Sequence, residues 1–231
     1  FGSEEKIVRL DLAEYQNLTD LERLLGSIEQ ESSFLTRVRE NPFSLVLLDE
    51  IEKAHPNILN LFLPLLDEGF LHDGLGRKVS FSNTMVIATS NAGYQVILEA
   101  IKQKTEMPAV KEKLLSYIFN QATFRPEFIN RFDAVVVFRG LTPIDLRGIA
   151  RLKLKKLQKN LMEKGIDFVS TPELENEVAR LGFDPVFGAR AMQRVIQDKV
   201  ENVLAQALLA GELKRGSRIQ IQVPEFKLVM G

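Results

Sequence analysis

The feature that most constrains this chain is a set of short β-rich runs separated by segments with helical spacing. The runs cover residues 7–10, 45–48, 85–88 and 135–138. The last three are almost continuously apolar, which is typical of strands buried on both faces. The predicted helices between them cover 21–38, 56–66 and 110–119. This alternation predicts an α/β fold built on a covered, parallel sheet.

The character of the chain changes after Gly140. We therefore expect residues 1–140 to form a large α/β domain and residues 141–231 a small, mostly helical one. Start signals such as Thr142-Pro143 and glycine stop signals bound the helices of the second domain. Its predicted helices cover 142–164, 172–181 and 189–210. The segments 218–223 and 226–230 predict a terminal pair of strands.

Composition excludes several classes of function. Thirty basic and thirty-one acidic residues give a net charge of -1, so no overall field directs the chain to nucleic acid or anionic lipid. The chain has no cysteine, which removes disulfides and thiolate chemistry, and His55 and His72 are too few for a histidine metal site. No apolar run approaches the roughly 20 residues that span a bilayer, and no secretory signal begins the chain, so we expect a cytoplasmic protein.

The sharpest local feature is the end of the second run, where Asp49 and Glu50 follow Leu48. The carboxyl ends of parallel strands form the ligand-binding edge of open α/β sheets. An aspartate there can hold Mg²⁺ through its water shell, and a neighbouring glutamate can polarise an attacking water. The alternative interpretation is an ordinary hydrophobic strand that ends in an acidic turn.

A short amide follows the third run in the same way. Asn91 comes directly after Ala88-Thr89-Ser90 and would lie at the same sheet edge if the two strands are parallel neighbours. It could orient a water or a γ-phosphate. The alternative is a turn residue ahead of Gly93.

Arginines stand in two further segments. Arg125 and Arg131 precede the last run, and a guanidinium suits the neutralisation of a transferring phosphoryl group. A surface salt bridge is the alternative for either residue. Arg190 falls in the predicted first turn of the last long helix, where a cation opposes the helix dipole. For Arg190 the alternative is an ion pair with Asp184.

Together and in this order, these segments resemble the second, C-terminal AAA+ module of Clp-family unfoldases and disaggregases, and closely that of ClpB-like proteins. The resemblance covers nearly the whole chain and implies an AAA+ type parallel sheet with flanking helices, then a small, mostly helical domain. The string LVLLDEIEKAHP is similar to the Walker B segment, LDEGFLHDGLGRKVSFSNTMVIATSN to the hairpin and sensor 1, FRPEFINRFD to the arginine-finger box and GFDPVFGAR to sensor 2.

The resemblance also implies roles for single residues. Asp49 would support Mg²⁺, Glu50 would activate the water, Asn91 would sense the γ-phosphate, and Arg190 would report nucleotide from the small domain. Arg131 would reach into a neighbouring subunit's site, which implies a homo-oligomeric ring, usually a hexamer. Such rings bind ATP or ADP with Mg²⁺ and thread a polypeptide substrate through a central pore.

The chain departs from the family pattern at the phosphate-binding loop, because no G-x-x-x-x-G-K-[ST] occurs in it. We expect nucleotide binding by the chain alone to be weak or absent. In the family, the strand that feeds this loop lies between the sensor 1 strand and the last strand. Its absence would leave backbone donors and acceptors unpaired within the sheet. We expect another segment to fill the gap, or the natural protein to be longer, with the loop upstream of Phe1.

A second departure lies between Gly26 and Phe34, where the family usually has a longer, glycine-rich pore loop with an aromatic residue that grips substrate. This segment contains no tyrosine that could grip substrate. We also see no docking motif for a ClpP-type protease in residues 92–123. That favours a disaggregase-like or stand-alone role.

The function that follows is nucleotide-dependent protein remodelling, by unfolding or disaggregation. A hypothesis of a different class is a non-hydrolysing AAA+ assembly module that supports a ring and donates Arg131 to a partner's site. Oligomerisation without nucleotide binding would be its signature. The third interpretation is a soluble α/β domain whose motifs are accidental.

Overall fold

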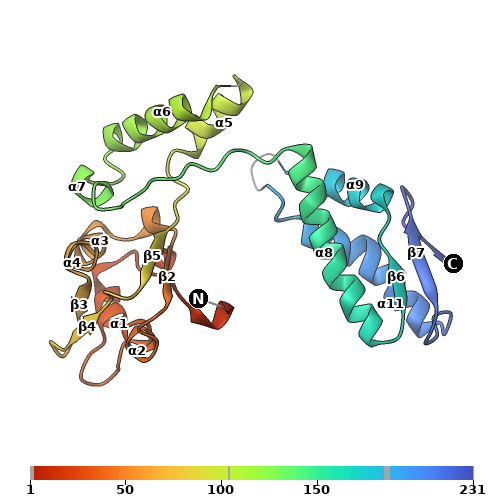
Figure 1. Ribbon diagram of the computed structural model, residues 1–231, viewed down its shortest axis with the longest axis horizontal. Helices are drawn as coiled ribbons and strands as arrows, with labels where there is room; N and C mark the ends of the chain where they lie inside the picture. The colour runs from red at the N-terminus through yellow and green to blue at the C-terminus, as the bar shows by residue number, and fades with distance from the viewer. Residues whose placement is uncertain (1–2, 104, 185–187, 231) are drawn as a thin grey trace. The chain divides into compact units, whose positions relative to one another are not determined.

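A computed structural model of the chain describes residues 3–103, 105–184 and 188–230. The chain divides into two compact units, Phe1–Arg139 and Gly140–Gly231, which we call unit 1 and unit 2. Each unit has its own sheet and its own helices (Figure 1). Among the described residues, no helix combines the length and the apolar character needed to cross a lipid bilayer.

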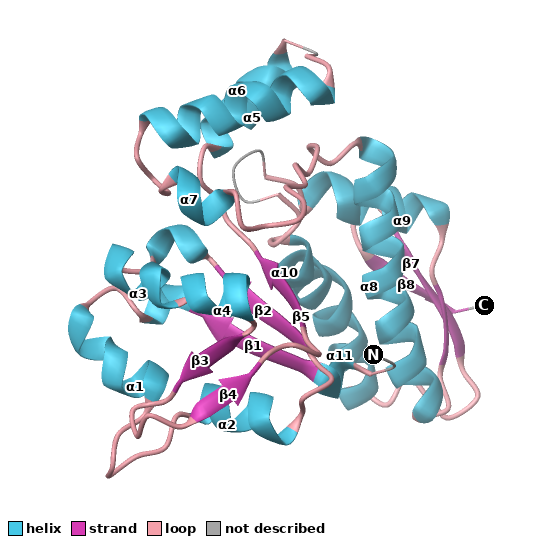
Figure 2. Cartoon of the chain, turned by 60° about the vertical axis from the view of Figure 1, so that its left-hand side comes forward, coloured by secondary structure: helices cyan, strands magenta, loops and turns pink. Residues whose placement is uncertain are grey.

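Unit 1 is built on a parallel sheet with the strand order β1-β2-β5 (Figure 2). The strands are β1 (Ile7–Asp11), β2 (Leu45–Asp49) and β5 (Met85–Ala88). Residue 45 of β2 lies between residue 7 of β1 and residue 85 of β5, so the strands run in step. The predicted parallel α/β sheet is confirmed. Its carboxyl ends, including those of β2 and β5, meet at one edge.

The two faces of this sheet differ in burial. Alternate side chains of a strand point to opposite faces, and Val8, Leu10, Val46 and Leu48 are buried on one of them. On the other face of β5, Met85 is 54% exposed and Ile87 is 40% exposed. The prediction that these apolar runs are covered on both faces is therefore wrong for β5, whose outer side chains nothing in the described part of the chain buries.

The fourth predicted strand does not form. Residues 135–138 run as an irregular segment that pairs with no strand in the described part of the chain (Figure 1). Val136 is 73% exposed and Phe138 is 84% exposed. An apolar cavity of about 150 Å³ lies between Ala88 at the end of β5 and residues 134–137. The physical reason is that a strand needs a hydrogen-bonded neighbour, and the outer edge of β5 reaches none here.

The three predicted helical segments of unit 1 are helical with two interruptions, and two further helices, over Tyr94–Lys102 and Pro126–Ile129, form outside them. The segment 21–38 breaks at Gly26, whose φ of +83° lies in the left-handed region. The segment 56–66 divides at Phe62, because Pro64 enters the first turn of the next helix. The helices are α1 (Leu21–Leu25), α2 (Ser33–Glu40), α3 (Pro56–Leu61), α4 (Leu63–Glu68), α5 (Tyr94–Lys102), α6 (Met107–Asn120) and α7 (Pro126–Ile129).

A small hairpin extends unit 1 between α4 and β5. Its strands are β3 (Phe70–His72) and β4 (Lys78–Ser80), which pair in antiparallel register. The turn between them spans residues 73–77, and its Gly76 has a positive φ of 75°. This hairpin carries one of the polar networks described below.

Unit 2 opens with α8 (Pro143–Glu163), whose start matches the prediction. The Thr142 hydroxyl accepts a hydrogen bond from the N–H of Asp145 at 3.3 Å, and the Asp145 carboxylate accepts one from the N–H of Thr142 at 2.8 Å. This reciprocal pair is a capping box, which satisfies two N–H groups that have no hydrogen-bond partner within the helix.

The rest of unit 2 packs a three-stranded sheet with helices. The predicted terminal strand pair is present, and a third strand, β6, joins it in parallel with β7. The predicted helix 189–210 begins at Met192 and contains a π-helical turn. The elements are β6 (Asp167–Val169), α9 (Pro172–Leu181), α10 (Met192–Ile196), the π-helical turn (Gln197–Glu201), α11 (Asn202–Leu209), β7 (Arg218–Gln222) and β8 (Lys227–Met230).

Candidate functional site

The candidate site is the carboxyl edge of the unit 1 sheet, where β2 and β5 end side by side. The backbone N–H of Ile51 donates to the carbonyl of Thr89 at 3.1 Å, and the N–H of Glu50 donates to the Thr89 hydroxyl at 3.2 Å. These bonds tie the turn after β2 to the turn after β5. Because the strands are parallel neighbours, the two segments that sequence analysis singled out share one rim.

Asp49 occupies the end of β2 with both carboxylate oxygens engaged. Its Oδ1 accepts a hydrogen bond from the Thr89 hydroxyl, and its Oδ2 accepts one from the Arg9 guanidinium on β1 at 2.5 Å. The Thr89 hydroxyl holds the pKa of Asp49 below its ordinary value, and the charge of Arg9 acts in the same direction against the opposing effect of burial. Asp49 is therefore ionised at neutral pH, as a ligand for a hard cation must be.

Glu50 begins the turn after β2 in a backbone conformation that few non-glycine residues adopt. Its φ of 54° and ψ of 48° lie in the left-handed region. Such conformations cost about 1–3 kcal/mol and cluster at functional sites, where the surrounding structure holds them. The side chain is half-buried, and within the described residues its carboxylate forms no hydrogen bond or ion pair.

Asn91 is exposed and follows the turn that Ser90 stabilises. The Ser90 hydroxyl donates to Glu52 Oε2 at 2.9 Å and accepts from the N–H of Ala92 at 3.0 Å. The other carboxylate oxygen of Glu52 is buried and has no hydrogen-bond partner among the residues that the structure describes. A second hydroxyl bridge, parallel to the Thr89 bridge, thus links the two turns and fixes the backbone on either side of Asn91.

Sequence reasoning missed three residues of this edge, namely Arg9, Glu52 and Thr89. For Arg9 a signal was present, because strand alternation places it on the same face of β1 as Asp11. Thr89 directly follows an apolar run and ends the strand with a hydroxyl. Neither signal identifies a partner, since the pairing depends on the register between strands.

The predicted arginine-finger residue has a partner of its own within unit 1. Arg131 Nε donates to Asp67 Oδ2 on α4 at 2.5 Å, and its Nη1 donates to the carbonyl of Glu127. The side chain is 29% exposed. Arg125 lies 3.9 Å from the carboxylate of Glu127, which is the surface pair that sequence analysis gave as its alternative.

Arg190 lies in unit 2, and the prediction that it stands in the first turn of the last long helix is wrong. The helix starts at Met192, so Arg190 stands in the turn before it and not in its first turn. Asp184 and Gly188 form a bridge, and residues 189–191 form a turn after it, so the helix begins only at Met192. The side chain is exposed. Part of the predicted segment, residues 185–187, lies outside the described residues.

The segment expected to hold a pore loop is a short closed turn. Gly26 and Glu31 form an antiparallel bridge, and the N–H of Ser27 donates to the carbonyl of Gln30 at 2.7 Å. Ile28 at its tip is 90% exposed. No aromatic residue occurs between Gly26 and Phe34.

The residues present fit one part of a nucleotide site. Asp49 is an ionised oxygen donor, and Glu50 has a carboxylate without a partner among the described residues. Metal-dependent phosphoryl transfer uses groups of these two kinds. The described residues contain no cluster of three or more potential metal ligands, so Mg²⁺ would need oxygen atoms of water or phosphate to complete its coordination. The motif that would hold those phosphates does not occur in the chain.

Comparisons with known proteins agree with this geometry. Residues 1–135 match the family model for the AAA domain (Cdc48 subfamily), and residues 141–221 match the model for the C-terminal, D2-small domain of ClpB protein. The chain is 40% identical over 227 residues to the chaperone protein ClpB of Meiothermus ruber, and 40% identical over 231 residues to that of Vibrio cholerae. These alignments cover 96% and 97% of the chain.

A solved structure shows the same fold. A cryo-EM reconstruction of the closed state of Hsp104 with ATPγS and FITC-casein superposes with a TM-score of 0.86 at 27% identity, over 100% of this chain and 40% of that one. The chain therefore belongs to the AAA domain family. Within it, the two units together form a C-terminal, ClpB-like AAA+ module. The chain spans about a quarter of the length of these ClpB relatives, namely 26% and 27%.

Proposed function

We propose that this chain is the C-terminal motor module of a ring-forming chaperone that unfolds or disaggregates proteins in a nucleotide-dependent way. The observation that carries the proposal is the pair of strand ends at which Thr89, the residue after β5, holds Asp49 and the turn at Glu50. The relatives named ClpB are chaperones, and the Hsp104 reconstruction contains ATPγS and casein. Both support a nucleotide and a polypeptide as the ligands.

Each residue of the edge has a role in this proposal. Asp49 supports Mg²⁺, Glu50 accepts a proton from the attacking water, and Asn91 contacts the γ-phosphate. Mg²⁺ and ATP, when bound, supply the transferable phosphoryl group and the positive charge that stabilises its transfer. The Thr89 bridge holds the Asp49 carboxylate, and the two hydroxyl bridges fix the backbone at Glu50 and on either side of Asn91 before the ligand arrives. This reduces the reorganisation needed in the reaction.

The phosphate contacts have to come from a segment beside β5. The unpaired edge of β5, the cavity next to Ala88 and the unpaired residues 135–138 support a strand that lies between them. Such a strand would supply the backbone partners that both segments need. A glycine-rich loop at its carboxyl end would then lie at the same edge as Asp49 and Glu50.

We further propose that residues 1–140 act as the large AAA+ subdomain and residues 141–231 as the small one. In a homo-oligomeric ring, expected to be a hexamer, Arg131 would reach the site of a neighbouring subunit. It would exchange its bond to Asp67 for one to phosphate, and phosphate suits the guanidinium fork equally well. Arg190, exposed in unit 2, would report the nucleotide state.

A second candidate function is a non-hydrolysing assembly module that stabilises a ring and donates Arg131. It is favoured by one observation, the lack of G-x-x-x-x-G-K-[ST] in the chain. The two functions differ in the need for Glu50. A hydrolysing module needs its carboxylate, whereas an assembly module does not.

Measurement of ATP hydrolysis distinguishes the two functions. The protein to be tested is the chain joined behind a strand, loop and helix that carry the G-x-x-x-x-G-K-[ST] motif and come from a ClpB relative. Glu50→Gln should lower the steady-state rate by roughly 10²–10⁴-fold, the usual effect of losing a general base, and leave ADP binding unchanged. Glu112→Gln, exposed on α6, is the matched control. Equal hydrolysis by both variants would reject the proposed role of Glu50. Ring formation without hydrolysis in any of the proteins would favour the assembly module.

A further inference from the structure

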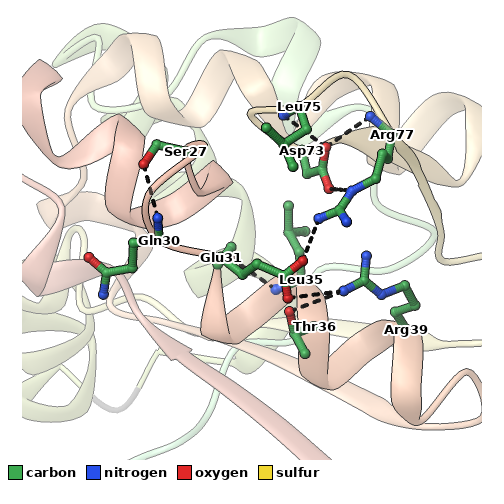
Figure 3. Close-up of polar contacts among 10 residues, drawn as sticks. Ser27, Gln30, Glu31, Leu35, Thr36, Arg39, Asp73, Leu75 and Arg77 are labelled. Carbon is green, nitrogen blue, oxygen red and sulfur yellow. Dashed lines mark hydrogen bonds and ion pairs between the residues drawn. The ribbon is translucent and has the colours of Figure 1, made fainter.

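Two loops of unit 1 contact each other through a backbone hydrogen bond and through charged side chains, and Figure 3 shows the charged contacts. One is the short turn over residues 26–32 between α1 and α2, and the other is the β3–β4 turn over residues 73–77. The N–H of Gly74 donates to the carbonyl of Leu25 at 3.0 Å, which joins the second turn to the base of the first. Neither loop contributes a residue to the strand-end site.

A charged network spans the two loops, with Arg77 at its centre. Arg77 Nη2 donates to Glu31 Oε1 at 2.9 Å, and Arg77 Nε donates to Asp73 Oδ2 at 2.6 Å. Arg39 on α2 lies 3.5 Å from the other carboxylate oxygen of Glu31. One guanidinium therefore holds a carboxylate from each loop, as Figure 3 shows. The planar fork of arginine permits this double contact, which the single ammonium of lysine cannot reproduce.

Asp73 is buried at 8% exposure and anchors the network in its own turn. Its Oδ1 accepts hydrogen bonds from the N–H of Leu75 at 3.0 Å and the N–H of Arg77 at 2.8 Å. Burial alone would raise the pKa of Asp73, but the hydrogen bonds from Arg77 and Leu75 outweigh it and lower the pKa. The hydrogen bond from Arg77 likewise lowers the pKa of Glu31. Both carboxylates are thus charged at neutral pH.

The backbones approach so closely that no side chain fits between them. A Cβ placed on Gly74 would lie 1.8 Å from the carbonyl oxygen of Gly26. Gly26 itself has a φ of +83°, and a Cβ there would lie 2.6 Å from the backbone nitrogen of Ser32. The contact between the loops is therefore made by backbone as well as by charge, and it restricts how either loop can shift alone.

We propose that Arg77 couples the 26–32 loop and the β3–β4 turn into one conformational unit, so that a displacement of one loop displaces the other. The coupled unit carries two exposed apolar side chains at its tips, Ile28 at 90% exposure and Leu75 at 45%. Single exposed ion pairs contribute little, but here one cation is shared by two carboxylates, of which one is buried. This coupling does not depend on the nucleotide proposal, since no residue of the strand-end site takes part.

The test is backbone hydrogen exchange of the full chain, comparing Glu31→Gln with Glu29→Gln. Glu29 lies in the same loop, is exposed, and forms no ion pair among the described residues, so it is the matched control for loss of one charge. Glu31→Gln should speed exchange by roughly two- to fivefold at Ser27 in one loop and at Leu75 and Arg77 in the other. Amides of β2 should not change, which shows that the fold is intact.

Two outcomes would overturn the proposal. Faster exchange confined to residues 26–32, with the β3–β4 turn unchanged, would show that the loops move independently. Equal exchange rates in the Glu31→Gln and Glu29→Gln variants would show that the ion pair between Glu31 and Arg77 does not couple the loops. Arg77→Lys is the second variant, because it keeps the charge and removes the double contact. It should speed exchange in both loops, and its failure to do so would contradict the role given to Arg77.

Discussion

The hydroxyl of Thr89 donates a hydrogen bond to the carboxylate of Asp49, and the same oxygen accepts the N–H of Glu50. One side chain at the end of β5 therefore positions both acidic residues at the end of β2. The hydrogen bond from Thr89 is also the largest cause of the lowered pKa of Asp49. The register of the sheet therefore determines this contact, because residue 89 reaches residue 49 only when β2 and β5 are parallel neighbours in this register.

Removal of this hydroxyl should loosen the strand ends. Thr89→Val keeps the shape of the side chain but leaves Asp49 Oδ1 and the N–H of Glu50 without their partner. The free energy of unfolding of unit 1 should fall by about 1–3 kcal/mol, and the pKa of Asp49 should rise. Thr89→Ser, which keeps the hydroxyl, is the control. Urea unfolding and NMR titration measure the two effects, and identical values for the Val and Ser variants would contradict this account.

In unit 2, two arginines of α8 hold one buried glutamate of α9. Arg147 Nε lies 3.3 Å and Arg151 Nε 3.0 Å from the carboxylate of Glu175, whose side chain is 6% exposed. A doubly substituted Arg147→Met, Arg151→Met chain leaves this carboxylate buried and unpaired. Unit 2 should lose stability, because the carboxylate stays buried without its partners. The loss should exceed the sum of the losses in the two single variants, because either arginine alone still pairs the charge. Strict additivity in denaturant unfolding would count against this arrangement.

The same cluster predicts a dependence on pH. The hydrogen bond from Arg151 lowers the pKa of Glu175 from its ordinary value of 4.5, with Arg147 adding to it against burial. A carboxyl whose folded pKa is depressed stabilises the protein above its unfolded pKa and loses that contribution as the pH falls through the folded pKa. The stability difference between the wild-type chain and Glu175→Gln should therefore shrink between about pH 6 and about pH 3. A constant difference over this range would be the contrary result.

Replacement of two glycines by alanine should have opposite effects on stability, because one glycine lies at a close backbone approach and the other lies on an open helix face. Gly74→Ala places a Cβ 1.8 Å from the carbonyl oxygen of Gly26, whereas at Gly148 on α8 nothing lies within 4 Å. The first variant should destabilise unit 1 by about 1–3 kcal/mol, as overpacking does. The second should stabilise unit 2 by about 0.5–1 kcal/mol, because alanine favours helix. Thermal unfolding measures both, and a shift of the same sign in the two variants would refute the comparison.

Local patterns predicted most of this fold. The runs at 7–10, 45–48 and 85–88 form strands within one residue of the predicted ends, because their partners are present in the described sheet. The run 135–138 has the same apolar character but no neighbour, and a strand exists only as part of a sheet. The capped helix that begins at Pro143 was predictable because Thr142 and Asp145 act within four residues.

The candidate site was predictable only in part. Asp49 and Glu50 follow a run of strand residues, and this local pattern identifies a sheet edge. The partners Arg9, Thr89 and Glu52 come from pairings between segments about 40 residues apart, and no local pattern encodes such register. For Asn91, Arg131 and Arg190 the local patterns left a structural alternative open beside the functional role, and their roles remain proposals.

The proposed function requires that this chain hold the metal-supporting and water-activating half of a nucleotide site and that a strand beside β5 supply the other half. Its most direct test is titration with a fluorescent ADP in Mg²⁺, for the chain alone and for the chain joined behind the motif-bearing segment. The account predicts no saturable binding by the chain alone and a Kd of about 1 μM, near −8 kcal/mol, for the joined protein. Asp49→Asn in the joined protein should weaken binding in Mg²⁺ and leave it unchanged in a chelator. Micromolar binding by the chain alone, or an Asp49→Asn variant with unaltered affinity in Mg²⁺, would contradict it.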